Sequence, residues 1–398
     1  MTLLPRLPIL IRRREIGGAL GCLTLLFLGW SSLAVPSLVR QVEAGFAQSD
    51  AGLGLYYFVG AVAYAIGSLV GGAATGRFGR RVVLVTAILL SGGGLVLQGI
   101  LPSWTAFLLL SVPRGLGGGG LDGGVSAMVL DLFPDSRGRA LNFVHLFFAL
   151  GAFVAPIAFG ALADAGVAWQ VLLGVTGAVS LLIALPMLVA DLGDRPHVAG
   201  TPATHAGRLW LAPAILALGT GIGLYVAAEM GVSSWLVRYL AAAPLTVATT
   251  GLGLFWGGLM LGRLVSARFA DRFDHLALAL AASFASAVAL AGAILVPAIP
   301  VQIALFALVG FAFGPIYPLI VAVAGERFPG RASAVSGILT AAGVLGSVVY
   351  PPLMGLLSVS VGLTAAMAGT VLICIGCGGA IAVAGRLRLP DHAAAESA

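Results

Sequence analysis

The sequence is divided into about twelve apolar runs of roughly 20 residues, and arginine is distributed unevenly between these runs. A helix of that length spans the ~30 Å hydrocarbon core of a bilayer. The gaps alternate, because arginines precede the first run and follow the even-numbered ones, while the other gaps are nearly bare of arginine. Basic residues stay on the cytoplasmic side during insertion, so this alternation predicts an even number of spans with both termini in the cytoplasm.

The composition excludes a soluble domain. Of the 398 residues, 60% are hydrophobic and only 9% are charged, and the mean hydropathy is +1.07. Such values are typical of chains that live in a lipid bilayer. The net charge of +6 lies in the short loops, where it serves membrane topology and attraction to anionic lipid, so we expect no nucleic-acid partner.

Two features of the rarer residues limit the chemistry. All 21 basic residues are arginine, which excludes a phosphate-binding loop with its lysine and a lysine Schiff base. The three cysteines all lie in apolar runs, and Cys374 and Cys377 form a CxxC inside the last run. Packing is the simpler interpretation of that pair than redox or metal binding. We therefore expect no cofactor, no metal and no enzymatic activity.

The order of the apolar runs predicts an all-α membrane protein with two halves. We expect a six-helix bundle at 1–190, a polar cytoplasmic linker at 191–208, a second bundle at 209–388 and a short cytoplasmic tail at 389–398. The spans are expected near 16–39, 51–75, 82–101, 105–132, 140–163, 168–190, 209–240, 246–268, 275–297, 301–325, 332–357 and 361–386.

The two halves repeat one another at an offset of 195 residues. This offset pairs glycines, an Arg-Phe dipeptide, a Phe-Pro dipeptide and an acid: Gly67 with Gly262, Arg77 with Arg272, Phe78 with Phe273, Gly119 with Gly314, Asp131 with Glu326, Phe133 with Phe328 and Pro134 with Pro329. Six spans per half give both copies the same topology, as parallel repeats about an axis normal to the membrane require. The repeat predicts two pseudo-symmetric bundles around a central site.

Ionisable residues inside the spans are the strongest functional signal. They are Arg114, Asp122, His145, Glu229 and Arg263. A charge at the bilayer centre costs ~2.5–3.5 kcal/mol on insertion scales, so such residues face a wet pathway or one another. The functional interpretation assigns proton coupling to Asp122 and Glu229, and the alternative is that some of these groups only lock helices together.

Asp122 follows a glycine run, Gly117 to Gly120, which thins the helix and gives water or ligand access to the carboxylate. A carboxylate in a site of low dielectric is easier to protonate, which suits a proton carrier. Arg114 lies eight residues earlier on the same helix, about two turns away, so a direct pair between the two is left open.

The loop after the second span, GGAATGRFGRR from Gly71 to Arg81, resembles the signature GxxxDRxGRR of the major facilitator superfamily, although Gly76 stands in place of the acid. The resemblance covers nearly the whole chain. In that family the loop is a cytoplasmic latch between inward-open and outward-open states. Carried over, the latch residues are Gly72, Arg77, Gly79 and Arg80 in the first copy, and Asp271 and Arg272 in the second.

Four segments resemble the fucose/galactose/glucose–cation symporter branch, which contains the fucose permeases. They are LYVAAEMGVSSWLVRYL from Leu224, FWGGLMLGR ending at Arg263, LNFVHLFFALGA from Leu141 and GPIYPLI from Gly314. The resemblance implies import of monosaccharides with protons, or with sodium in some animal relatives. The family's essential fourth-span glutamate falls on Asp122 and a fifth-span glutamine on His145, whereas its first-span aspartate falls near Ser32.

Candidate solute-binding residues combine polar groups with aromatic rings that could stack on a sugar. They are Arg114, Asn142, His145, Arg263, Trp256, Trp235, Tyr317 and Tyr57. For the aromatic residues the alternative is packing or a place in the interfacial belt. His145 has three interpretations, namely a structural group, a proton relay with Asp122, or a direct solute contact.

The sequence as a whole predicts a secondary transporter with the major facilitator fold: twelve transmembrane helices in two bundles that rock about a central site. We expect a monomer in the bacterial inner membrane that takes up a monosaccharide-like small molecule with protons, or with sodium. The rival interpretation is a proton-driven antiporter that exports a drug-like or less polar metabolite. It rests on Arg114 and the glycine run, which resemble an exporter motif of the fourth span.

Overall fold

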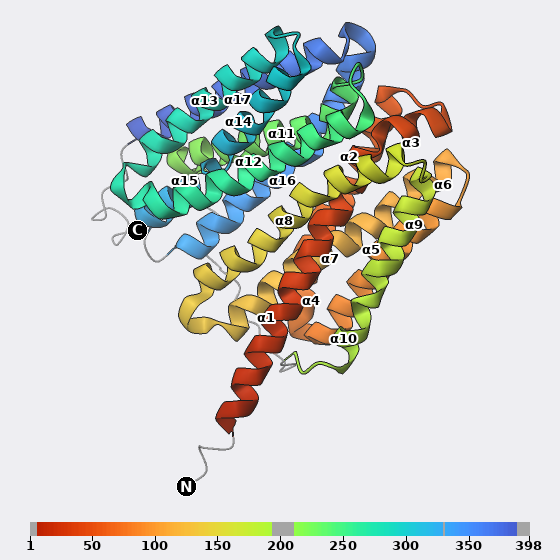
Figure 1. Cartoon of the computed structure of the whole chain (residues 1–398). Helices are drawn as coiled ribbons and strands as arrows, with labels where there is room; N and C mark the ends of the chain where they lie inside the picture. Colours follow the sequence, from red (N-terminus) through yellow and green to blue (C-terminus); the bar gives the residue numbers. More distant parts are fainter. Residues whose placement is uncertain (1–5, 193–210, 329–330, 388–398) are drawn as a thin grey trace. The chain divides into compact units, whose positions relative to one another are not determined.

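The computed structural model describes residues 6–192, 211–328 and 331–387, and the side chains of 6–13, 271, 332 and 333 are not part of that description. Every regular element in these ranges is a helix, which confirms the all-α prediction. The chain falls into two compact units (Figure 1). Unit 1 comprises Met1–Gly200 and Leu236–Trp256, and unit 2 comprises Thr201–Trp235 and Gly257–Ala398. Most of the expected linker and the expected tail lie outside the described residues, so the predicted domain boundaries stay a prediction.

Unit 1 is built from long helices joined by short turns. In Figure 1, α1 lies along α8 and α5 lies along α9, while α4 and α5 both pack on α7. The helices of the first half are α1 (Arg6–Ser32), α2 (Ala34–Ser37), α3 (Val39–Phe46), α4 (Asp50–Phe78), α5 (Arg80–Ile100), α6 (Trp104–Leu109), α7 (Ser111–Leu132), η1 (Pro134–Ser136), α8 (Arg137–Asp164), α9 (Trp169–Leu182) and α10 (Ala184–Val189).

Unit 2 has the same kind of construction. Here α13 packs on α14, α15 and α17, and α16 packs on α15 and α17. The helices of the second half are α11 (Pro213–Tyr239), α12 (Leu245–Phe269), η3 (Ala270–Arg272), α13 (His275–Leu295), α14 (Ile299–Phe313), α15 (Ile316–Arg327), α16 (Ala332–Val361) and α17 (Leu363–Arg386). The break between α14 and α15 falls at Gly314 and Pro315, because proline cannot continue a helical hydrogen-bond ladder.

Eleven helices in the described part of the chain are long and apolar enough to cross a membrane. The expected span at 105–132 is helical, as α6 and α7, but it is not among the eleven. Its glycines, together with Arg114 and Asp122, make this segment much less apolar than its neighbours. The many-spanning membrane architecture is therefore confirmed, and the twelfth crossing remains a prediction.

Repeated glycines mark places where two helix backbones touch. A Cβ added to Gly67 would lie 2.2 Å from the carbonyl oxygen of Leu116, and one added to Gly262 would lie 2.1 Å from that of Phe311. The 195-residue offset relates the two contacts, because it carries Gly67 onto Gly262 and Leu116 onto Phe311. Both glycines thus fill the same role within their own unit, and only glycine permits the approach.

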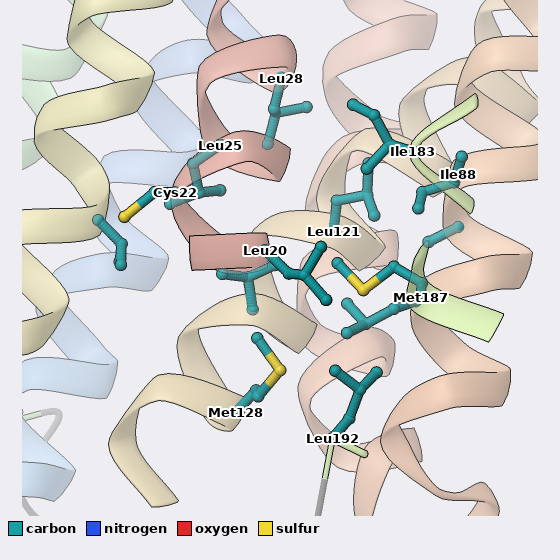
Figure 2. Close-up of a cluster of buried hydrophobic side chains, with 14 of the residues drawn as sticks. Leu20, Cys22, Leu25, Leu28, Ile88, Leu121, Met128, Ile183, Met187 and Leu192 are labelled. Carbon is teal, nitrogen blue, oxygen red and sulfur yellow. The ribbon is translucent and has the colours of Figure 1, made fainter. Parts of the chain in front are cut away.

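A cluster of buried apolar side chains holds the helices of unit 1 together. Figure 2 shows Leu25 of α1, Ile88 of α5, Leu121 and Met128 of α7, and Met187 of α10 within one cluster. Most of these side chains are almost fully buried. The position of α7 among α1, α5 and α10 fixes the direction in which the polar residues of α7 point.

One guanidinium group holds the C-terminal end of α11 inside unit 1. Arg40 of α3 donates from Nε to the carbonyl oxygen of Val237 at 2.8 Å, from NH1 to that of Ala243 at 2.8 Å and from NH2 to that of Leu240. A cation is favourable at a helix C-terminus, where the last carbonyls lack partners. Beside it, Arg238 Nε pairs with Glu43 Oε2 at 2.8 Å.

Candidate functional site

The central ionisable group of unit 1 joins α7, α8 and α4. Asp122 Oδ1 lies 4.0 Å from His145 Nε2. The same imidazole nitrogen lies 3.3 Å from the Ser126 hydroxyl oxygen, and Tyr64 donates a hydrogen bond to the Asp122 carboxylate. The side chains of Asp122 and His145 are 27% and 34% exposed. Two titratable groups on neighbouring helices thus meet each other while both retain exposed surface.

Arg114 does not pair with Asp122. It donates from NH1 to the Tyr56 hydroxyl and from NH2 to the carbonyl oxygen of Ser31 at 2.8 Å, which ties α7 to α4 and α1. Eight residues correspond to about 12 Å of rise and about 80° of rotation on a helix, so Arg114 and Asp122 point to different neighbours. Tyr57 stands next to this group, with its ring 5.7 Å from that of Tyr56.

Unit 2 has its own buried ionisable group, made by α11 and α12. Tyr225 donates its hydroxyl proton to the carboxylate of Glu229, which is 6% exposed. Arg263 interacts electrostatically with Tyr225, Glu229 and Tyr317. Its Nε is buried and makes no hydrogen bond within the described residues. A carboxylate and a guanidinium therefore share one region of the unit, and their charges offset one another.

The two predicted tryptophans are packed inside the protein. Trp235 is fully buried, and its Nε1 donates to the carbonyl oxygen of Pro351 at 2.9 Å. Trp256 is 3% exposed and packs at 6.0 Å against the ring of Phe148. Rings so deeply buried offer no face to a solute in this conformation. Asn142, by contrast, is exposed on α8.

Four residues near these groups were not singled out from the sequence, namely Tyr64, Ser126, Tyr225 and Thr340. Two of them carry a signal that could have found them: Ser126 and Tyr225 are four residues from Asp122 and Glu229, and this spacing places residues on one helix face. Thr340 could have been found from the repeat, since it lies 195 residues after His145. Tyr64 has no such signal.

The repeat relates one polar pair in each unit. The 195-residue offset carries Asp122 onto Tyr317 and His145 onto Thr340. In unit 2 the hydroxyl oxygens of Tyr317 and Thr340 lie 3.1 Å apart, between α15 and α16. The same two positions of each half are therefore in side-chain contact, but the residue types differ.

The signature loop of the first half is held by an ion pair between a buried arginine and a partly exposed aspartate. Gly79 connects α4 to α5 with a φ of +83°, a conformation that glycine adopts at no steric cost. Arg80 pairs with the carboxylate of Asp131 and donates to the carbonyl oxygen of Leu192 at 2.7 Å. Arg77 lies over the ring of Phe78, 5.4 Å from its centroid. Gly72 lies on α4, one residue away from the close contact between Gly71 and Gly120.

The second half repeats the pair with a different basic side chain. His275, 195 residues after Arg80, places Nδ1 2.8 Å from Oε1 of Glu326, the counterpart of Asp131. Arg272 lies over the ring of Phe269 at 5.4 Å. The side chain of Asp271 lies outside the described residues. The same acidic position of the repeat therefore faces a guanidinium in the first half and an imidazole in the second.

An all-helical chain with many apolar spans, an internal repeat and ionisable groups inside the spans has the architecture of a polytopic membrane transporter. The family model of the Major Facilitator Superfamily matches residues 19–338 and 245–398. The chain belongs to that superfamily.

Similar proteins include sugar transporters. A glucose/galactose transporter of Brucella abortus is 27% identical over 386 residues, covering 88% of this chain and 90% of that protein. The crystal structure of a D-xylose-proton symporter aligns with a TM-score of 0.75 at 18% identity, over 94% of this chain and 97% of that chain. The E. coli fucose:proton symporter aligns with a TM-score of 0.64 at 18% identity, over 94% and 100%. These two structures support the fold, and the Brucella protein supports the resemblance to the sugar–cation symporter branch.

Proposed function

We propose that the chain is a secondary active transporter that takes up a monosaccharide-like solute together with protons, by alternating access. It acts as a monomer with twelve spans in two six-helix bundles, and both termini lie on the cytoplasmic side of a bacterial inner membrane. The solute and the coupling cation are its only small-molecule partners, and it catalyses no chemical reaction. The full-length similarity to a glucose/galactose transporter supports the solute class.

The observation that carries the coupling proposal is the contact between Asp122 and His145. The two groups lie 4.0 Å apart, both keep exposed surface, and Tyr64 and Ser126 complete their hydrogen bonding. An aspartate in a membrane span is expensive unless it serves the transport path. Histidine changes charge near neutral pH, so the pair can take up and release a proton during a transport cycle.

The group around Glu229 suits a neutral polar solute. Glu229 and Arg263 offset each other's charge, and Tyr225 bridges to the carboxylate. A solute with hydroxyl groups can exchange hydrogen bonds with such a pair without adding a charge of its own. We assign Glu229 a second proton-coupling role and Arg263 a solute-binding role.

The remaining assignments rest on residue type for the solute contacts and on the family resemblance for the signature loops. Arg114, Asn142, Trp256, Trp235 and Tyr57 are proposed solute contacts. The two buried tryptophans need a change of conformation before they can act in this way. The two signature loops are proposed to gate the cytoplasmic side, through Gly72, Arg77, Gly79, Arg80, Asp271 and Arg272.

Uptake by purified protein in proteoliposomes tests the proposal. An inward proton gradient should drive accumulation of radiolabelled D-glucose or D-galactose, and a proton ionophore should abolish it. Asp122→Asn should lose this accumulation and keep exchange of external for internal sugar, because exchange needs no net proton movement. Asp135→Asn changes an exposed aspartate of the η1 turn and serves as the matched control.

Other outcomes would point elsewhere. If Asp122→Asn leaves both accumulation and exchange at wild-type rates, the coupling role is wrong. Accumulation that follows a sodium gradient at constant pH would replace the proton with sodium. Proton-driven movement of amphiphilic compounds out of cells, with no sugar uptake, would favour the antiporter interpretation instead.

A further inference from the structure

The hydroxyl pair of unit 2, Tyr317 and Thr340, combines hydrogen-bonding capacity with exposure. Their oxygens lie 3.1 Å apart, and Thr340 also donates to the carbonyl oxygen of Ser336 at 2.9 Å. A threonine hydroxyl has one proton and two lone pairs, so with its proton on Ser336 it accepts from Tyr317. Lone pairs on both oxygens then remain available to a hydroxyl donor from a ligand.

The position of the pair indicates a wet surface. Tyr317 belongs to the span Ile299–Arg327 and Thr340 to the span Ala334–Val361. At 1.5 Å of rise per residue, Tyr317 lies about 15 Å from the end of its span at Arg327, and Thr340 lies about 9 Å from the end of its span at Ala334. Thr340 is exposed and Tyr317 is partly exposed. Polar groups inside membrane spans face a protein interior or an aqueous path more often than lipid.

The repeat gives this pair a counterpart with different chemistry. Asp122 and His145 occupy the same repeat positions in unit 1 and are in contact at 4.0 Å. An aspartate and a histidine can carry a proton, whereas the hydroxyl groups of tyrosine and threonine act as neutral donors and acceptors of hydrogen bonds. The same two repeat positions thus hold groups that can exchange a proton in the first half and neutral hydrogen-bonding groups in the second.

We infer that Tyr317 and Thr340 form a subsite that binds a hydroxyl group of a neutral polyhydroxy solute, and that the two halves divide the work at equivalent positions. Unit 1 carries the proton at Asp122 and His145, and unit 2 recognises the solute. The inference rests on the proposed function. Neighbouring polar residues support the inference. The ring of Tyr317 lies 6.4 Å from that of Tyr225, whose hydroxyl donates to Glu229. Arg263 also interacts electrostatically with Tyr317.

The chain offers a matched control for the experiment. Tyr350 and Thr370 form a second Tyr–Thr hydrogen bond in unit 2, at 2.9 Å, and both side chains are buried. The alternative explanation of the exposed pair is that it merely ties α15 to α16. Removing hydroxyls from both pairs, one at a time, separates a loss of helix contact from a loss of solute binding.

The test measures transport affinity for D-glucose, D-galactose and their monodeoxy analogues in proteoliposomes. Thr340→Val and Tyr317→Phe should each raise KM for the parent sugar about 2- to 10-fold, the value of one neutral hydrogen bond. One deoxy analogue should be bound weakly by the wild type and be insensitive to Thr340→Val, because it lacks the hydroxyl that the subsite holds. Thr370→Val and Tyr350→Phe should leave KM unchanged.

The pH dependence of uptake gives the second readout. His145→Gln should alter this dependence, whereas Thr340→Val should preserve the wild-type profile at a higher KM. The inference is overturned if Thr340→Val and Tyr317→Phe leave KM unchanged for a sugar that the wild type transports, or if they weaken every analogue equally. Failure of the wild type to transport any sugar would instead overturn the proposed function and, with it, this inference.

Discussion

The two signature loops differ in the basic side chain that faces the acid and in how exposed the pair is, and this difference predicts an asymmetric response to mutation. We consider Arg80→Gln in the first half and His275→Gln in the second, which remove the basic side chain at equivalent positions of the repeat. Arg80 is 10% exposed and Asp131 is 33% exposed, whereas His275 is 19% exposed and Glu326 is 61% exposed. The first pair is thus better shielded from water than the second.

The magnitudes follow from that shielding. Arg80→Gln leaves the partly exposed carboxylate of Asp131 without its cation and weakens the hydrogen bond to the Leu192 carbonyl, so we expect a loss of about 1–2 kcal/mol in the free energy of unfolding. The pair of His275 with Glu326 is solvent-exposed on one side and is worth about 0–1 kcal/mol.

Unfolding of the detergent-solubilised protein, followed by tryptophan fluorescence in a denaturant series, measures both effects. Arg80→Gln should lower the free energy of unfolding by about 1–2 kcal/mol, and His275→Gln should lower it by no more than about 1 kcal/mol. Equal losses for the two variants, or a larger loss for His275→Gln, would refute the reasoning.

Three further predictions concern residues outside the candidate site and the signature loops. Arg40→Met should lower the free energy of unfolding by about 2–4 kcal/mol, because the carbonyl oxygens of Val237, Leu240 and Ala243 lose their common donor. Arg40→Lys should recover only part of this free energy, and denaturant unfolding measures both variants. Burial raises the pKa of the Glu43 carboxyl, and the Arg238 guanidinium offsets only part of that rise. The folded state then binds a proton more readily than the unfolded chain, so the stability of the wild type relative to Glu43→Gln should grow as the pH falls from 7.5 to 5, and a constant difference would contradict this. Gly119→Ala should prevent α7 from packing on α4, because the added Cβ would lie 2.0 Å from the carbonyl oxygen of Tyr64. Gly93→Ala is the control and should be tolerated, because its Cβ would meet nothing within 4 Å. The yield of monodisperse protein measures both effects.

The predicted helices agree with the structure wherever the sequence has a long, uninterrupted apolar run. The eleven membrane-crossing helices correspond to expected spans, with ends that differ by a few residues. The expected span formed by α6 and α7 is not among these eleven helices, because Arg114, Asp122 and the glycine run make it less apolar. The short helix α2 falls within the expected first span, whereas the short helix α3 after that span was not predicted.

The sequence predicted some members of the candidate site and left their contacts open, with a relay between His145 and Asp122 as one of three interpretations of the histidine. Asp122 and His145 were both chosen as ionisable groups inside spans, and the structure places them together. Arg114 was a candidate partner for Asp122, yet it bonds Tyr56 and Ser31. Tyr64 completes the group from another helix, and nothing in its own segment marks it for that role.

The sequence by itself determined the membrane class, the helical segments and the repeat between the halves. These follow from hydrophobicity and from residue spacing along one chain, which lipid and helix geometry translate directly into spans. Only the tertiary structure decided which ionisable side chains meet, because contact between helices depends on their rotation and on how closely glycines let them approach. The offset that equates Asp122 with Tyr317 could be read from the chain, but the hydrogen bond between Tyr317 and Thr340 required the packing of α15 on α16.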